Sequence, residues 1–152
     1  MNLLNLLGFS HITFTTLCFL VIIFLPRLFV HKSDFSRHSL IATIISLMLI
    51  NHGMDFYYEG YRDQLKLGLP IHLCDFSSAA IILYFFTKRR VFFLFAFFAG
   101  ISGAGMAMLT PDSEYGFPNI HYVRHMIGHA MILLGVSYAI IIDNQRPYLK
   151  DV

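Results

Sequence analysis

The chain has 152 residues, of which 57% are hydrophobic and 13% are charged, and its formal net charge is +2. A soluble domain of this size carries roughly a quarter charged residues, so the composition argues against a soluble globular protein. The small basic excess gives nucleic-acid binding no support, because short basic connections between apolar segments account for it.

Five apolar segments approach the ~20 residues that a helix needs to cross a bilayer. In chain order they cover residues 12–30, 40–57, 69–86, 91–109 and 121–142. The connections between them are too short to bury a core of their own. The sequence therefore predicts an all-α fold, a polytopic membrane helix bundle with five transmembrane helices that forms one domain over residues 1–152. The second, third and fifth helices carry more polar residues than the other two.

The connections alternate in charge along the chain. Those after the first and third predicted helices are basic, whereas those after the second and fourth are net acidic. The basic residues are Arg27, Lys32, Arg37, Lys88, Arg89 and Arg90. Because Lys and Arg gather in the cytoplasmic loops of membrane proteins, we expect the N-terminus outside and the C-terminus in the cytoplasm.

The third predicted helix opens with reactive side chains, His72, Cys74 and Asp75. Such groups cost free energy in lipid and are therefore expected to serve chemistry rather than stability. Cys18, the other cysteine, lies near the middle of the first helix, whereas Cys74 lies close to the outer end of the third. We expect no disulfide between them, because their depths differ, and we interpret Cys18 as an apolar filler.

Histidines recur on the fifth predicted helix at His121, His125 and His129, every four residues, and so share one face. His52, beside Asn51, reaches the same outer layer from the second helix. His72 and Cys74 are two residues apart and point to different sides, which makes His72 a poor partner for the thiol. His72 and Asp75, three residues apart, can pair. A base for Cys74 must then come from another helix, and the spacing leaves both His125 and His129 open.

This pattern suits nucleophilic catalysis by sulfur. The thiolate is the reactive form, and a thiol with a pKa near ~8.5 needs a histidine or a helix N-terminus to ionise at neutral pH. Pro70 suits a first helical turn, which predicts Cys74 just after the positive end of the helix dipole. An acyl group can then pass to sulfur and on to a second acceptor while histidine moves the protons. This chemistry requires no metal and no cofactor.

Two other interpretations stay open. In the first, the chain binds or transports a metal, because it offers the ligand types that zinc or copper prefer. These ligands are His72, Cys74, Asp75, His121, His125 and His129. Against this, the sequence has no C-x-x-C or H-E-x-x-H motif. In the second, the chain is a structural membrane subunit in which Cys74 and the histidines can be exchanged without loss.

Four segments carry a resemblance to a known family. They are LPIHLCDFS at 69–77, TPD at 110–112, MIGHAMILLG at 126–135 and RPYLKDV at 146–152. Together they resemble the YwaF-like bacterial integral membrane proteins. That family is similar to an animal transmembrane acyltransferase that remodels ether phospholipids and, more distantly, to the androgen-induced lipid hydrolases.

The resemblance carries expectations for function and topology. It implies Cys74 as the acyl-accepting nucleophile, His129 as its base, a phospholipid or acyl-lipid substrate and a bacterial inner membrane. Members of that family usually have seven helices, so the resemblance also implies that two C-terminal helices are absent from residues 1–152. It says nothing of the oligomeric state.

Two further features concern the outer surface and the fourth helix. Arg124 is placed to hold a lipid phosphate bidentately, although snorkelling of its guanidinium to the interface is the favoured interpretation. Small residues recur every four positions along the fourth helix, which predicts close packing against a neighbouring helix. They are Ala96, Gly100 and Ala104 in one stripe, and Gly103 and Ala107 in the next.

Overall fold

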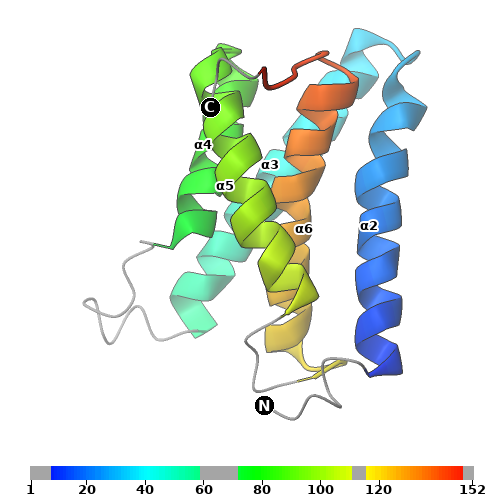
Figure 1. Cartoon of the computed structure of the whole chain (residues 1–152), viewed down its shortest axis with the longest axis vertical. Coiled ribbons are helices and arrows are strands. Elements are labelled where there is room, and N and C mark those ends of the chain that lie inside the picture. Colours follow the sequence, from blue (N-terminus) through cyan, green and yellow to red (C-terminus); the bar gives the residue numbers. More distant parts are fainter. Residues whose placement is uncertain (1–7, 59–71, 111–115, 149–152) are drawn as a thin grey trace.

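The computed structural model describes residues 8–58, 72–110 and 116–148, with side chains in the first range described through residue 54. These residues form five helices and, within the described ranges, no strand (Figure 1). The helices are α2 (Phe9–Phe29), α3 (Asp34–Tyr58), α4 (Leu73–Thr87), α5 (Arg90–Leu109) and α6 (Ile120–Ile141). The prediction of an all-α bundle with five helices is confirmed, while three of these five, within the described residues, are long and apolar enough to be membrane spans.

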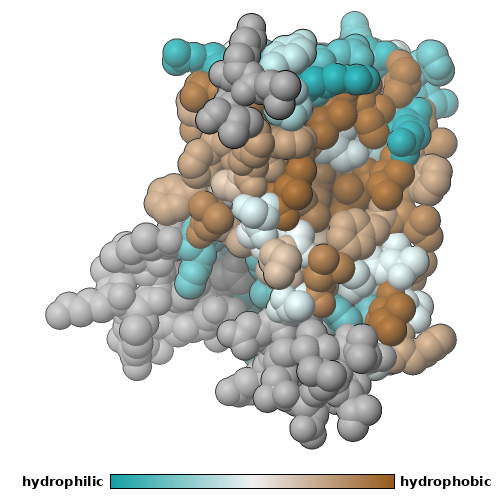
Figure 2. All heavy atoms as spheres, viewed as in Figure 1, coloured by the Kyte–Doolittle hydropathy of each residue, from teal (hydrophilic) through white to brown (hydrophobic). Residues whose placement is uncertain are grey.

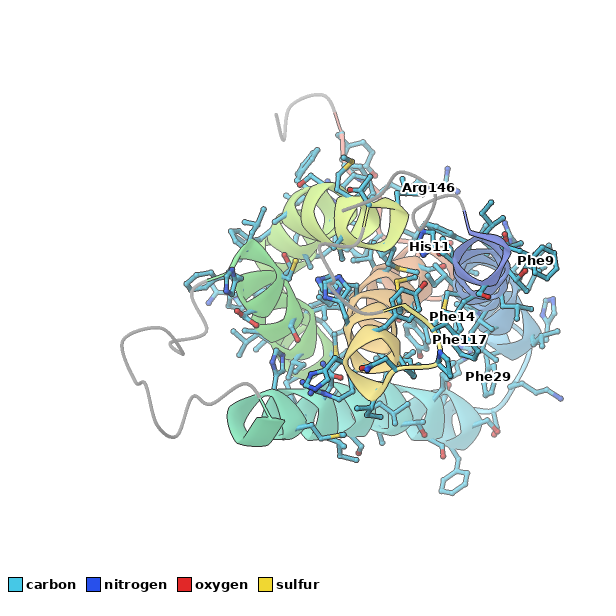
Figure 3. The ribbon with its side chains drawn as sticks, turned by 90° about the horizontal axis from the view of Figure 1, so that it is seen from below. Phe9, His11, Phe14, Phe29, Phe117 and Arg146 are labelled. Carbon is cyan, nitrogen blue, oxygen red and sulfur yellow. The ribbon has the colours of Figure 1, made fainter. Side chains whose placement is uncertain are left out.

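The helices run alternately up and down, and α6 lies in the middle of the bundle (Figures 1 and 3). It contacts each of the other four helices, and α5 also packs against α4. We call the end where α4 and α6 begin the Cys74 end. The opposite end, where those two helices finish, is the Asp143 end. Every other helix contacts α6. Side chains from different helices therefore come together where they pack on the same face of α6.

The bundle has the surface of a membrane protein. In the described part of the chain α2, α5 and α6 are long and apolar enough to cross a bilayer, while α4 is apolar but has 15 residues. Figure 2 shows a broad hydrophobic band with hydrophilic atoms gathered at the Asp143 end. Large apolar side chains such as Phe24, Leu28 and Phe86 are exposed, as expected for a surface that meets lipid.

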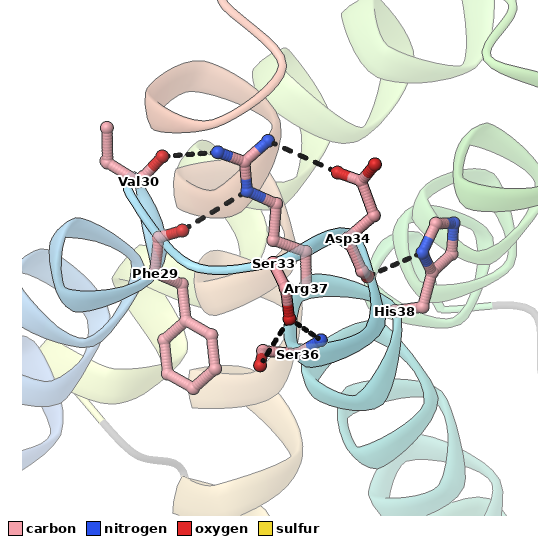
Figure 4. Close-up of polar contacts among 7 residues, drawn as sticks. All are labelled: Phe29, Val30, Ser33, Asp34, Ser36, Arg37 and His38. Atoms are coloured by element: carbon pink, nitrogen blue, oxygen red, sulfur yellow. Dashed lines mark hydrogen bonds and ion pairs between the residues drawn. The ribbon is translucent and has the colours of Figure 1, made fainter.

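α3 begins six residues earlier than the predicted start at residue 40. Ser33 caps it, because its Oγ accepts the backbone N–H of Ser36 at 3.3 Å. The Arg37 guanidinium donates to the carbonyl oxygens of Phe29, at 3.2 Å, and Val30 (Figure 4). These polar contacts fix the link between α2 and α3. Apolar content alone misses this start, since the first turn of α3 is polar.

α4 begins at Leu73, four residues later than predicted. The Asp75 carboxylate accepts the backbone N–H of His72 at 3.1 Å, which closes the start of the helix. Cys74 is therefore the second residue of α4. Pro70, Asp112 and residues 149–152 lie outside the described residues, as do the side chains that make two connections acidic.

Glycines set the closest approaches to α6, and the predicted packing of the small-residue stripe is confirmed. A Cβ added to Gly100 of α5 would lie 3.1 Å from Ile132 Cγ2, and one added to Gly135 of α6 would lie 2.8 Å from Ile81 Cγ1. Ala96 and Ala104 are fully buried. The helices therefore pack at distances that larger side chains would prevent.

Candidate functional site

Cys74 lies in the first turn of α4 with its sulfur against α5. It is half-buried, and a Cβ added to Gly103 would lie 3.3 Å from its Sγ. The absence of a side chain at Gly103 makes room for the thiol. Cys18 is also a free thiol, so the expectation of no disulfide is confirmed.

The packing of three helices fixes the depth of the thiol relative to the histidines. Ser77, Gly100 and Ile132 meet at one point, because a Cβ on Gly100 would lie 3.9 Å from Ser77 Cβ and 3.1 Å from Ile132 Cγ2. Cys74 and His129 are each three residues from this junction toward the Cys74 end, a step of about 4.5 Å along a helix.

Residues three apart on a helix also share a face. Helical geometry therefore predicts His129 near the depth of Cys74, on the face of α6 that carries Ile132 toward α4 and α5. His125 lies about 6 Å further toward the Cys74 end, one turn beyond the thiol.

The two α6 histidines contact each other. Nδ1 of His129 lies 2.7 Å from the backbone oxygen of His125, and the ring centroids are 4.3 Å apart. A carbonyl oxygen can only accept, so Nδ1 of His129 carries the proton and Nε2 carries the lone pair. Nε2 of His125 is buried without a hydrogen-bond partner among the described residues. A buried nitrogen in that state costs free energy, which marks this face of α6 as more than packing.

α3 joins the same layer from the other side of α4. His52 Nε2 lies 2.8 Å from Ser78 Oγ, and its Nδ1 lies 3.7 Å from Asp75 Oδ1. Its neighbour Asn51 packs on α6, because a Cβ added to Gly128 would lie 2.5 Å from the Asn51 Nδ2. The predicted convergence of the second, third and fifth helices is confirmed. Ser78, as the partner of His52, was not singled out from the sequence.

Two other candidate site residues, His72 and His121, lie at the starts of their helices. His72 is exposed and contacts Asp75 through its backbone N–H, while the Asp75 carboxylate also faces His52. His121 belongs to the start of α6, where its N–H donates to the Asn119 side chain at 2.9 Å.

Arg124 is only 5% exposed, so the favoured expectation of snorkelling to the interface was wrong. It lies four residues before Gly128, on the face of α6 that packs on α3. Its side chain therefore points into the bundle rather than toward the lipid surface.

The metal ligands proposed from the sequence do not form a group that could hold an ion among the described residues. Across residues 8–54, 72–110 and 116–148, no group of three or more His, Cys, Asp and Glu side chains is close enough to hold an ion. All six ligands proposed from the sequence lie in these ranges. Cys74 and Asp75 point to α5 and α3 respectively, which separates them from each other.

A second buried polar pair lies between α2 and α6, on a different side of α6. His11 Nδ1 lies 2.6 Å from the Tyr122 hydroxyl, and both residues are buried. Near them an apolar cavity of about 230 Å³ is lined by Phe14, Cys18 and Met131, among others. Cys74 is not among its lining residues, so a lipid chain held there would not present its ester to the thiol. No spacing in the sequence pointed to His11, because it precedes the first apolar segment.

Comparisons with known proteins place the chain in a family. An uncharacterized protein of Treponema pallidum (strain Nichols) is 29% identical over 107 residues, which are 70% of this chain and 42% of that protein. The chain thus spans less than half the length of this relative. No solved structure matches significantly. The family model of the TMEM164 family matches residues 6–152. Since this match covers almost the whole chain, the protein belongs to the TMEM164 family, a family of transmembrane proteins.

Proposed function

We propose that the protein is a membrane-embedded lipid acyltransferase that carries the acyl group as a thioester on Cys74, with His129 as the base. The observation that carries this proposal is the junction of Ser77, Gly100 and Ile132, from which Cys74 and His129 are each three residues away on their own helices. The resemblance of the cysteine and histidine segments to the YwaF-like family, which is similar to an ether-phospholipid acyltransferase, also supports it.

Cys74 lies where two features of α4, the start of the helix and the Asp75 carboxylate, act on its thiolate in opposite directions. As the second residue of α4 it lies in the first turn, where backbone N–H groups have no acceptor within the helix. The positive end of the helix dipole stabilises an anion on sulfur, whereas the Asp75 carboxylate on the next residue opposes it. The same N–H groups can stabilise the oxyanion that forms when an acyl carbonyl is attacked at Cys74.

His129 is the better base of the two that the sequence left open. Its Nδ1 is held by the His125 carbonyl, so that Nε2 has the lone pair that proton abstraction requires. His125 lies one turn beyond the thiol and contacts His129 through its ring. We assign His125 to holding the His129 ring in place.

The reaction proceeds in two steps. His129 Nε2 takes the thiol proton as sulfur attacks the ester carbonyl of a phospholipid, and the lysolipid leaves with that proton. A lipid hydroxyl, or water in a hydrolase, then attacks the thioester while His129 again accepts and returns a proton. The acceptor decides between transfer and hydrolysis. We propose transfer to a lipid hydroxyl as the main reaction, because the site lies in a bundle with a lipid-facing surface.

We also propose that the Asp143 end faces the cytoplasm of a bacterial inner membrane, since Arg27, Lys88 and Arg89 lie there. Cys74 is then reached from the outer half of the bilayer. A reporter that is active only in the cytoplasm, fused after Val152, should be active; an inactive fusion in a folded protein would reverse the orientation.

The test of the function is acyl transfer between phospholipids in vesicles that contain the purified protein. Cys74→Ser should lower turnover by about 100-fold or more, because serine lacks an acidic thiol. Cys18→Ser is the matched control, since Cys18 is also a free, half-buried thiol and should keep full turnover. Unchanged turnover in Cys74→Ser would remove the proposal.

A further inference from the structure

His52, Asp75 and Ser78 form a constellation that the proposed function does not use. His52 Nε2 lies 2.8 Å from Ser78 Oγ, while Nδ1 of the same ring faces Asp75 Oδ1 at 3.7 Å. Asp75 and Ser78 are one turn apart on α4, and His52 reaches both from α3. A hydroxyl on one ring nitrogen and a carboxylate on the other is the arrangement that activates serine nucleophiles on unrelated folds.

The position of the ring proton on His52 determines which groups donate and which accept. The Ser78 hydroxyl donates to Nε2 when Nδ1 carries the ring proton, and that proton then points to the Asp75 side. The 3.7 Å separation is an ion-pair distance that becomes attractive once the ring is protonated. The other Asp75 oxygen, Oδ2, is held by the His72 N–H at 3.1 Å, so the carboxylate is anchored at the start of α4.

The neighbouring serine shows that this bond is specific. Ser77 is fully buried like Ser78, but its hydroxyl donates to the Leu73 carbonyl of its own helix at 2.8 Å. This is the common way for a helical serine to satisfy itself in an apolar setting. Ser78 instead makes its bond across helices to a base. One serine therefore has an ordinary structural contact, while the other has a proton acceptor.

Cys74 lies one helical turn before Ser78 on α4. The two residues are four apart on α4, so their Cβ atoms are about 6 Å apart on one face. Ser78 Oγ is turned to His52 on α3, whereas Cys74 Sγ lies against Gly103 of α5, so an acyl group on sulfur has to pass around one turn of α4 to reach the hydroxyl. Ser78 is 2% exposed, so an acyl carbonyl reaches its Oγ only when α3 and α4 separate at this contact.

We propose that Ser78 is a second acyl-accepting nucleophile, activated by His52 and oriented for that role by Asp75. His52 Nε2 takes the hydroxyl proton as Oγ bonds to the acyl carbonyl carbon. The C–S bond to Cys74, or the C–O bond of a lipid ester, breaks, and the leaving thiolate or alkoxide receives the proton from the imidazolium. The product is an acyl ester on Ser78, with no oxidant or co-reactant required. Of the two acyl donors, only the Cys74 thioester depends on the proposed function; the lipid ester does not.

The experiment uses the full chain in phosphatidylcholine vesicles and a long-chain alkyl fluorophosphonate, which forms a stable bond with activated serines. Peptide mass mapping should place the phosphonate on Ser78 and leave Ser77 unmodified, a comparison within one molecule that needs no substitution. His52→Asn should slow labelling by about 100-fold, the usual contribution of a general base. Asp75→Asn, which keeps an acceptor for the His72 N–H, should slow it by about 10-fold.

Two further variants keep the outcomes distinguishable. Ser77→Ala should label at the wild-type rate. Cys74→Ala, which removes the thioester, should still label at Ser78, so this test does not depend on the Cys74 chemistry. With an acyl-labelled phospholipid in place of the probe, acyl-Ser78 that survives in Cys74→Ala identifies a lipid ester as the donor, and its loss identifies the thioester. No phosphonate on Ser78 of folded wild-type protein, or labelling indifferent to His52→Asn, would overturn the proposal and leave a packing contact between α3 and α4.

Discussion

The two ends of the bundle use polar side chains in different ways. At the Asp143 end, Asp143 Oδ2 accepts hydrogen bonds from the Tyr84 hydroxyl at 2.9 Å and from Lys88 Nζ at 2.7 Å. At the other end lies what we call the His–Cys layer, which consists of His52, Cys74, Asp75, Ser78, His125 and His129. There the His125 Nε2 is buried without a hydrogen-bond partner among the described residues, and the thiol lies against a glycine.

The difference separates polar groups that stabilise from polar groups held for chemistry. In the Asp143 cluster, defined as Tyr84, Lys88 and Asp143, donors and acceptor satisfy one another and tie α4 to the end of α6. In the His–Cys layer tight packing at Gly103 places the thiol, while polar contacts with the backbone and across helices hold the other groups. We therefore expect substitutions in the layer to lower activity more than stability, and substitutions elsewhere in the bundle to do the reverse.

The largest expected effect is at the proposed base. His129→Asn should lower acyl transfer by about 100-fold or more, since general base catalysis contributes at least that factor. His125→Asn should lower it only several-fold, because His125 lies one turn beyond the thiol. Rates of phospholipid acyl transfer in vesicles check both variants. A greater loss in His125→Asn than in His129→Asn would assign the base to His125.

The apolar part of the core should respond through stability alone. Gly135→Ala places a Cβ 2.8 Å from Ile81 Cγ1, a fully buried β-branched neighbour with no room to move. Such overpacking costs about 1–3 kcal/mol. Thermal unfolding in detergent should show a lower midpoint for Gly135→Ala and no loss for the control Gly105→Ala, whose added Cβ meets nothing within 4 Å. Equal midpoints for the two variants would contradict the packing described here.

The smallest effect is expected in the Asp143 cluster. Asp143→Asn keeps an oxygen that accepts from Tyr84 but removes the charge opposite Lys88, whose side chain is 49% exposed. A partly exposed ion pair of this kind contributes about 0–1 kcal/mol. We expect a slightly lower unfolding midpoint and unchanged acyl transfer. A loss of acyl transfer in a folded Asp143→Asn variant would contradict the conclusion that the Asp143 end serves stability and the Cys74 end serves chemistry.

Much of the fold could be predicted from the sequence, because apolar length and helical period are local signals. The helix count and the packing role of Gly100 followed from them. The start of α3 did not, since it depends on a cap at Ser33 and on Arg37 contacts with the preceding loop. The convergence of three helices on one layer was predictable from depth.

The partners within that layer were less predictable. The bond from His52 to Ser78 and the burial of Arg124 depend on how α3 is rotated against α4 and α6. Rotation about a helix axis is set by tertiary packing, and the spacing of residues in one helix does not reveal it. For the same reason spacing could not choose between His125 and His129, whereas the Gly100 junction gives their depths.

The most direct test of the account is to trap the acylated protein. The protein in vesicles with isotope-labelled phospholipid is quenched in acid, and the peptide that contains Cys74 is analysed by mass spectrometry. We predict a mass increase equal to one acyl group on Cys74 that neutral hydroxylamine removes, and far less of it in His129→Asn. Undiminished acyl transfer with Cys74 unmodified throughout the time course would contradict the account.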